Sequence, residues 1–193
     1  MNKKAAMFGL DARIALAIFG ALSVISGAAL YSAIQQAKVT ALVTDFKEIE
    51  KAIEQYVLDT GTDTPHNKSS ADGTSGCLVL SSDCTSANNW NGPYLPYKRL
   101  GSGYVDHPLY NYVYLRNNLD TEWGHPSEDS GAHFCSADTS KTCYHWIMIN
   151  GVSLDLQKAV DKFIDGEDSA IKGNVRYVAT ELYMKSIPTI SQL

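Results

Sequence analysis

Four cysteines are the residues most clearly placed for chemistry in this chain of 193 residues. They fall in two close pairs, Cys77 with Cys84 and Cys135 with Cys143. An even number of closely spaced cysteines favours disulfides when the protein lies in an oxidising compartment. The spacing favours a bond within each pair, although four cysteines allow three connectivities. Two such short loops would stabilise the folded state by about 2–3 kcal/mol each.

A zinc site is the alternative for the second cysteine pair. His133 and His145 each lie two residues outside a cysteine of that pair. Residues 133–145 lack the Cys-x2-Cys and His-x3-His spacings that structural zinc sites use, so disulfides remain the favoured prediction.

An acidic cluster near the C-terminus is the candidate for binding a small ligand. It consists of Asp161, Asp165, Glu167 and Asp168. Calcium prefers several hard oxygen ligands from one compact loop, so calcium is the ion that these residues would hold. Their order lacks the twelve-residue EF-hand pattern, and the alternative is an acidic, solvated turn that follows a helix.

The five histidines form no catalytic pattern. They are scattered along the chain at His66, His107, His125, His133 and His145. The sequence has no HExxH motif, no GxSxG motif and no Gly-rich phosphate loop, and no nucleophile can be identified. The sequence therefore predicts a protein that is not an enzyme.

Composition indicates a folded protein that does not bind nucleic acid. Hydrophobic residues make up 45% of the chain, which excludes disorder. The net charge is −5, and the basic runs are only the pairs Lys3-Lys4 and Lys98-Arg99, whereas phosphate neutralisation needs clustered Lys and Arg. The length allows one domain with an appendage.

A charge-free segment near the N-terminus could span a membrane. Residues 14–37 carry no formal charge, and residues 14–34 as a helix would measure about 30 Å, the thickness of the hydrocarbon core. Lys3, Lys4 and Arg13 should keep the N-terminal side in the cytoplasm, which places the rest of the chain outside. A secretory signal peptide cleaved near residues 26–29 is the alternative, although its apolar region is normally only about 7–15 residues long.

The helical pattern continues beyond this segment. Apolar residues recur at intervals of three and four, at Val39, Leu42, Val43, Phe46, Ile49, Ile53, Tyr56 and Val57. Charged residues fill the opposite face, so this half is amphipathic and needs a partner surface. We expect one long helix over residues 12–58, ended by the sequence Asp59-Thr60-Gly61.

Residues 59–193 have short apolar runs and many polar residues, which is typical of a small globular head. Alternating patterns predict strands at residues 110–116, 144–149 and 175–180. A helix is expected at residues 154–164, with Ser153 as its N-cap and Gly166 just past its end. The predicted fold class is α+β: a long N-terminal helix, membrane-spanning and then amphipathic, packed on a small antiparallel sheet.

Tyrosines are concentrated in one part of the head. Six of the 11 lie close together in sequence, at Tyr94, Tyr97, Tyr104, Tyr110, Tyr112 and Tyr114. They could form an adhesive or subunit-contact surface. The alternative is that they are strand residues packed on the long helix.

Together these features resemble the type IV pilins and the type II secretion pseudopilins. The N-terminus is similar to their short basic leader ending in Gly, here MNKKAAMFG, followed by a long apolar helix. Residues 90–95 (WNGPYL) resemble the W-x-G-P-Y-L segment of many members. Residues 161–166 (DKFIDG) and 173–176 (GNVR) resemble the D-x-x-x-D-G…G-x-V-R stretch of minor pilin-like proteins, and residues 106–112 are a loose echo of D-P-x-G-x-x-Y.

The resemblance implies processing at the N-terminus. Residues 1–9 would be a leader that a prepilin peptidase removes between Gly9 and Leu10, with methylation of the new N-terminus. The family usually has Glu at the fifth mature position, where this chain has Ile14. Asp11, at the second mature position, is the candidate substitute for that membrane carboxylate; without it, the resemblance implies a minor or tip subunit or a diverged system.

The resemblance also implies a function and a location. The chain would be a structural subunit of a type IV pilus-like or type II secretion-associated filament, formed with copies of itself or with related pilin subunits. It would lie in the bacterial inner membrane with its head in the periplasm, and then in an extracellular or periplasmic filament. The alternative is a monomeric, membrane-anchored adhesin or receptor. No cofactor is expected other than calcium.

Overall fold

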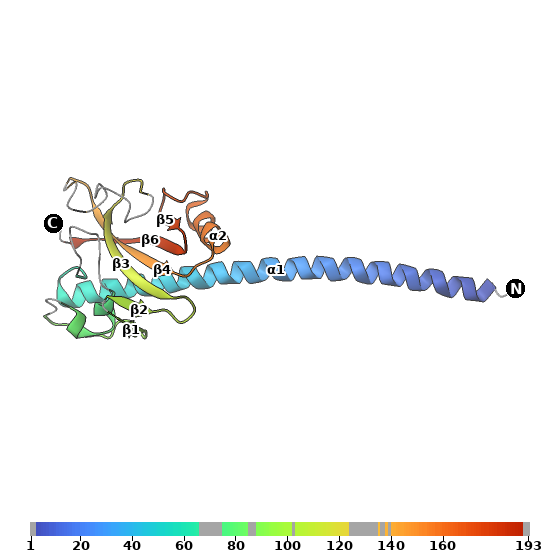
Figure 1. Ribbon diagram of the computed structural model, residues 1–193, viewed down its shortest axis with the longest axis horizontal. Helices are drawn as coiled ribbons and strands as arrows, with labels where there is room; N and C mark the ends of the chain where they lie inside the picture. The colour runs from blue at the N-terminus through green and yellow to red at the C-terminus, as the bar shows by residue number, and fades with distance from the viewer. Residues whose placement is uncertain are drawn as a thin grey trace. The chain divides into compact units, whose positions relative to one another are not determined.

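The computed structural model describes residues 3–65, 75–84, 88–101, 103–123, 135, 138 and 140–190, with side chains from residue 9 onward. The chain divides into two compact units, Met1–Thr40 and Ala41–Leu193. The first unit is helical, and the second contains a sheet, a second helix and the last part of the first helix (Figure 1). His66, His125 and His133 lie outside the described residues.

The first helix, α1 (Lys3–Thr60), has 58 residues. It confirms the prediction of one long helix, but it begins nine residues before residue 12 and ends two residues after residue 58. The earlier start follows from the sequence of the segment, since Lys, Ala and Met are strong helix formers and a single glycine at position 9 costs only about 1 kcal/mol. At the other end, the N–H of Gly61 bonds to the carbonyl of Val57, and Gly61 takes φ +67°, a conformation that stops a helix.

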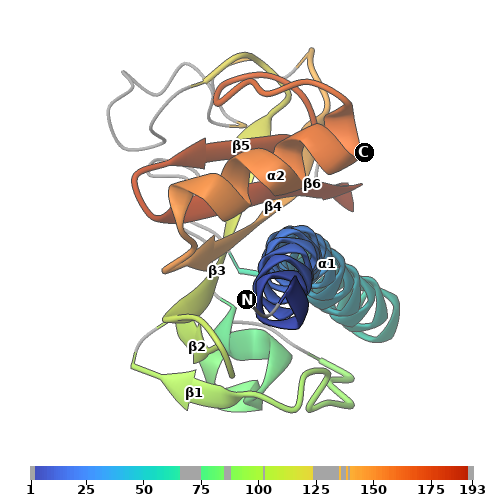
Figure 2. The same cartoon turned by 90° about the vertical axis from the view of Figure 1, so that its right-hand side faces the viewer.

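The head contains one sheet of six antiparallel strands in the order β1-β2-β3-β4-β6-β5. The strands are β1 (Lys98–Leu100), β2 (Tyr104–Asp106), β3 (Tyr112–Leu119), β4 (Cys143–Asn150), β5 (Val175–Val178) and β6 (Glu181–Pro188). The two long central strands pair over eight positions, including Val113 with Ile149 and Leu115 with Ile147. Figure 2 shows β1 and β2 at one edge of the sheet and β5, with α2 in front of it, at the other.

The core of the head lies between the sheet and the last third of α1. On α1 its buried residues are spaced by three and four, at Leu42, Val43, Phe46, Ile49, Ile53 and Tyr56. On the sheet the core residues are every second residue of a strand, so that Val113 and Leu115 of β3 point to the same face. Burying each of these large side chains stabilises the fold by about 1.5–3 kcal/mol. The α+β class, with a long helix packed on an antiparallel sheet, is confirmed.

The second helix, α2 (Leu154–Asp165), lies where the sequence predicted it and ends one residue later. Ser153 is the N-cap residue, with an extended backbone but no capping side-chain bond, and Gly166 at the C-cap has φ +80°. Two short 3-10 turns lie at the first cysteine pair: Gly76–Leu78 contains Cys77, and Ser81–Asp83 is followed directly by Cys84.

The strand predictions were only partly correct. The strand expected at residues 110–116 begins at Tyr112, because Leu109 and Tyr110 form a turn in which their N–H groups bond to the side chain of His107. The strand expected at residues 175–180 ends at Val178, because Ala179 takes φ +51° in the turn to β6.

Candidate assembly segment and head sites

Large apolar side chains cover the N-terminal unit on every side. Eleven of them are 45–73% exposed: Leu10, Ile14, Leu16, Ile18, Phe19, Leu22, Val24, Ile25, Leu30, Tyr31 and Ile34. At 100° per residue these positions cover the whole circumference of a helix. Covering each one with lipid or with another apolar helix is worth about 1.5–3 kcal/mol. Within the described residues, one helix is long and apolar enough to cross a membrane, so the segment has the character of a membrane anchor or a signal sequence.

The residues implicated in processing lie within this helix. Gly9 and Leu10 follow six residues of α1, and a Cβ added at Gly9 would meet nothing within 4 Å. Asp11 and Ile14 are both exposed, and they are three residues apart, so they lie on the same face of α1. Asp11 therefore presents a carboxylate on the helix face that carries Ile14. Cleavage after Gly9 and the substitute role of Asp11 stay predictions.

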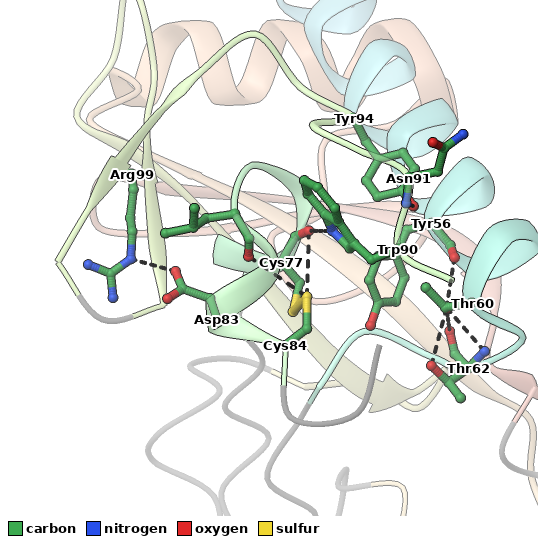
Figure 3. The surroundings of a disulfide bond; sticks show 11 residues. Tyr56, Thr60, Thr62, Cys77, Asp83, Cys84, Trp90, Asn91, Tyr94 and Arg99 are labelled. Atoms are coloured by element: carbon green, nitrogen blue, oxygen red, sulfur yellow. Dashed lines mark hydrogen bonds and ion pairs between the residues drawn. A yellow bond between two sulfur atoms is a disulfide. The ribbon is translucent and has the colours of Figure 1, made fainter. Parts of the chain in front are cut away.

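The first predicted disulfide is confirmed. Cys77 and Cys84 are bonded, with 5.1 Å between their Cα atoms. Cys77 is fully buried, and its carbonyl accepts a hydrogen bond of 2.8 Å from Nε1 of Trp90 (Figure 3). At the other side of this loop, Asp83 forms an ion pair of 2.5 Å with Arg99 on β1. The disulfide is thus fixed to the rest of the head at both of its ends.

The WNGPYL segment packs this disulfide loop onto α1. The ring of Tyr94 contacts the ring of Trp90 edge to face, with centroids 5.7 Å apart, and contacts Tyr56 of α1 at 5.8 Å. A Cβ on Gly92 would lie 2.6 Å from the Trp90 ring and 2.9 Å from the Tyr94 ring. The residue between these two aromatic rings must therefore be glycine. The WNGPYL segment therefore has a packing role in the head.

The second disulfide is also confirmed. Cys135 and Cys143 are bonded, with Cα atoms 5.4 Å apart, and none of the described cysteines is free. The zinc alternative required cysteine thiolates, so the disulfide overturns it. His145, the other described residue of that proposal, instead lies 3.1 Å (Nε2) from Oδ1 of Asp63.

The four acidic residues of the predicted calcium site bind different partners. Asp165 accepts hydrogen bonds of 2.8 Å from the N–H of Val175 and from the side chain of Asn174. Asp168 accepts a hydrogen bond from the hydroxyl of Tyr177, and Glu167 is exposed.

Asp161 is the buried member of this group. Its side chain accepts a hydrogen bond of 2.6 Å from the N–H of Ser169, while its other oxygen, Oδ1, has no hydrogen-bond partner. Burial, with smaller contributions from the charges of Asp165 and Asp168, raises the pKa of Asp161 to about 6. Within the described residues, no three His, Cys, Asp or Glu side chains are arranged to hold a metal ion. The cluster closes the connection between α2 and β5, and we do not propose calcium for it.

Arg176, in the GNVR segment, is buried against two aromatic rings. Its guanidinium lies 4.7 Å from the ring centroid of Trp123 and 4.4 Å from that of Trp146. It also forms an ion pair of 3.0 Å with Asp120 and donates to the carbonyl of Thr121. Burial lowers the pKa of Arg176 to about 10, so the side chain is still charged at neutral pH. The face of the Trp123 and Trp146 rings is therefore covered by the side chain of Arg176.

The tyrosines form separate contacts rather than one surface. Tyr104 packs against Tyr112 and Tyr114, with ring centroids 4.8 Å apart in both pairs. Tyr114 belongs to the cluster of Trp123, Trp146, Met148 and Tyr183, on the face of β3 opposite to Val113 and Leu115. Tyr97 and Tyr110 flank His107 instead. The prediction that these tyrosines pack on the long helix holds for Tyr94, which contacts Tyr56.

Sequence reasoning missed two pairs of a histidine and a carboxylate. His145 pairs with Asp63, which lies 82 positions earlier, and His107 pairs with Asp45 on α1 at 3.5 Å. No spacing rule connects residues so far apart. The one available signal was the alternation of the strand at residues 144–149, which places His145 on the inward face with Ile147 and Ile149.

The chain was compared with protein-family models, with characterised proteins and with solved structures, and nothing matched in any of the three.

Proposed function

We propose that this chain is a structural, non-enzymatic subunit of a type IV pilus-like or type II secretion-associated filament, assembled through its apolar N-terminal helix. The observation that carries this proposal is the apolar N-terminal unit, which exposes large side chains on all sides. A helix covered in this way is insoluble alone. It can be stable in lipid, or in the centre of a bundle of similar helices, and a filament subunit uses both environments in turn.

The chain also offers positions where such helices could approach closely. Small residues are frequent in the apolar part of α1, at Ala21, Ser23, Ser26, Gly27, Ala28 and Ala29. A Cβ added at Gly20 or Gly27 would meet nothing within 4 Å, so a neighbouring backbone has room there. In apolar surroundings, helix association depends on this kind of close packing. The partners are copies of this chain or related pilin subunits.

The order of the parts supports a defined route to the filament. Lys3, Lys4 and Arg13 would hold the N-terminus in the cytoplasm, while the head, with its two disulfides, would fold in the periplasm. A prepilin peptidase would then cut between Gly9 and Leu10, and the mature subunit would pass into an extracellular or periplasmic filament. Structural subunits of filaments need no active site or cofactor, and the proposal assigns none.

A monomeric membrane-anchored adhesin or receptor is the second candidate. One observation favours it: Ile14 occupies the position where the pilin family usually carries Glu, and only Asp11 presents a carboxylate on that face. If Asp11 does not replace the missing carboxylate, the helix would serve as an ordinary single-span anchor.

The fate of the N-terminus separates the two candidates. Filaments are sheared from cells, purified and subjected to N-terminal sequencing by mass spectrometry. The filament proposal expects this chain in that fraction, beginning at Leu10. Recovery only in the membrane fraction, with Met1 or Asn2 as the first residue, would contradict it and favour the anchored monomer. An Asp11→Asn variant, with Asp155→Asn on the exposed side of α2 in the head as a matched control, tests whether the Asp11 carboxylate is needed for incorporation.

A further inference from the structure

His107 is a buried histidine in the connection between β2 and β3. The residue is 4% exposed, and its ring lies between those of Tyr97 and Tyr110, with centroid distances of 5.6 and 5.0 Å. It begins a turn that brings the chain into β3 at Tyr112. The imidazole therefore occupies the inside of this turn.

The hydrogen bonds of the ring fix its protonation state. Nδ1 of His107 accepts the N–H of Leu109 at 3.1 Å and the N–H of Tyr110 at 3.2 Å. A nitrogen that accepts two hydrogen bonds carries a lone pair and no proton, so the neutral ring has its proton on Nε2. That atom lies 3.5 Å from Oδ2 of Asp45 on α1, and this approach is not a hydrogen bond. The turn is thus closed around a neutral histidine.

Adding a second proton is incompatible with this arrangement. The proton would sit on Nδ1, and three N–H groups would then point at one another. The two hydrogen bonds would be lost, and two partly buried backbone donors would be left without an acceptor unless the turn opens to water. Leu109 at the apex of the turn is 75% exposed, so its side chain adds little to hold the turn closed.

Several charged and titratable groups face this histidine. Burial lowers the pKa of His107, and the charge of Asp106 on β2 raises it by less. On α1, burial and the charge of Glu48 raise the pKa of the Asp45 carboxyl, which weakens the one anion in direct reach of the ring.

The two flanking tyrosines do not titrate near neutral pH, since burial raises the pKa of Tyr97 and of Tyr110. His107 therefore binds a second proton more weakly in the closed turn than in the open turn, where its pKa is near 6.5.

We propose that residues 107–111 form an acid-operated latch: protonation of His107 at Nδ1 breaks its bonds with the N–H groups of Leu109 and Tyr110, opens the turn and uncovers Tyr97 and Tyr110. The latch responds to the acidity of the compartment that surrounds the head. It does not depend on whether the chain forms a filament. At neutral pH the turn is closed, and it opens as the pH falls below about 6.5, with an opening constant that rises by up to about tenfold per pH unit, the limit for uptake of one proton.

Amide hydrogen exchange of the full chain in nonionic detergent micelles tests the latch. Exchange is measured by mass spectrometry at pH 7.5, 6.5 and 5.5 and corrected for the intrinsic effect of pH. We expect a peptide covering residues 105–112 to exchange faster at each lower pH, while a peptide from α2 stays protected. Unchanged exchange of the turn, or equal gains in both peptides, would overturn the proposal, because the second result means global unfolding.

His107→Asn is the matched variant. Its side-chain oxygen can accept the N–H groups two and three residues later, as asparagine commonly does in turns, but it cannot take up a proton. The variant should keep the turn closed and show no dependence of exchange on pH. A rise equal to that of the wild type would contradict the assignment to His107. The comparison within the wild-type chain remains decisive if this variant does not fold.

Discussion

Oδ1 of Asp63 lies 3.1 Å from Nε2 of His145, and the same oxygen accepts the N–H of Ile190 at 2.9 Å. One carboxylate therefore joins the segment after α1, the central strand β4 and the end of the chain. Both side chains are almost fully buried, with 4% of Asp63 and 0% of His145 exposed. Such a contact acts as a structural clamp, because without it the buried Nε2 of His145 would lose its hydrogen bond to Asp63.

Replacement of Asp63 by Ala should destabilise the head strongly. It would leave Nε2 of His145 and the N–H of Ile190 without their acceptor, which we expect to lower the free energy of unfolding by about 2–4 kcal/mol. Urea unfolding of the full chain in micelles, followed by tryptophan fluorescence, measures the change. Glu54→Ala, on the exposed face of α1, is the control and should stay within about 0.5 kcal/mol of wild type. A similar loss in both variants would show that Asp63 is not a clamp.

The features that sequence reasoning predicted correctly depend on local signals. The apolar face of α1 repeats every three or four residues, the cysteines of each disulfide are seven or eight residues apart, and α2 ends next to Gly166. Each of these signals lies within one segment of the chain, so a single sequence is enough to reveal it.

The features that it missed depend on contacts between distant segments. Strands β1 and β2 have three residues each, too few to show alternation. β6 was missed entirely, although it pairs with both β4 and β5. The clamp of Asp63 and His145, and the pairing of His107 with Asp45, join residues that only the completed fold brings together. For the same reason calcium remained a candidate for the acidic cluster beside a solvated turn, because the backbone donors that bond to Asp161 and Asp165 cannot be seen in the sequence.

The buried carboxyl of Asp161 makes a testable contribution to the pH dependence of stability. Its pKa is about 6 in the folded head, against 3.8 without the fold, so the folded state binds the proton more tightly. Stability from this group is therefore gained as the pH falls from about 6 toward 3.8 and is lost as the pH rises through 6. Asp161→Asn should raise the free energy of unfolding at pH 7.5 by about 1–2 kcal/mol, since the amide oxygen can still accept the N–H of Ser169.

The check is a comparison of the two proteins across pH. Denaturant unfolding is measured for wild type and Asp161→Asn from pH 7.5 to pH 4.5, and the difference between them should narrow as the pH falls through 6. The contribution of His107 is common to both proteins and cancels in that difference. A difference that does not change with pH, or a variant less stable than wild type at pH 7.5, would show that burial does not disfavour the charge of Asp161.

Gly173 should tolerate substitution much less well than Gly166, although both have positive φ angles, +88° and +80°. A Cβ on Gly173 would lie 2.4 Å from Oδ2 of Asp165, the atom that accepts the N–H of Val175, whereas a Cβ on Gly166 would meet nothing within 4 Å. We expect Gly166→Ala to cost about 1 kcal/mol from the left-handed backbone alone. Gly173→Ala should cost about 1–3 kcal/mol more from the steric contact, measured by thermal or urea unfolding. Equal losses would mean that the contact with Asp165 can relax freely.

Arg176 should be irreplaceable even by another cation. Its guanidinium stacks on Trp123 and Trp146 while it reaches Asp120 and the carbonyl of Thr121, and only a planar group with several donors can make all these contacts. Arg176→Lys keeps a charge but loses the stacking and part of the hydrogen bonding, so we expect the free energy of unfolding to fall by about 2–4 kcal/mol.

Lys185→Arg is the matched control for Arg176→Lys, because Lys185 also pairs with Asp120, at 2.9 Å, but lies over a single ring, that of Tyr144, at 5.3 Å. That variant should change stability by less than about 1 kcal/mol. Near-ultraviolet circular dichroism gives an independent readout, since loss of the guanidinium that packs against both indole rings should alter the tryptophan signal in Arg176→Lys and leave it unchanged in Lys185→Arg. A stable Arg176→Lys head with an unaltered tryptophan signal would show that charge alone, and not the planar guanidinium, holds β5 to the end of β3.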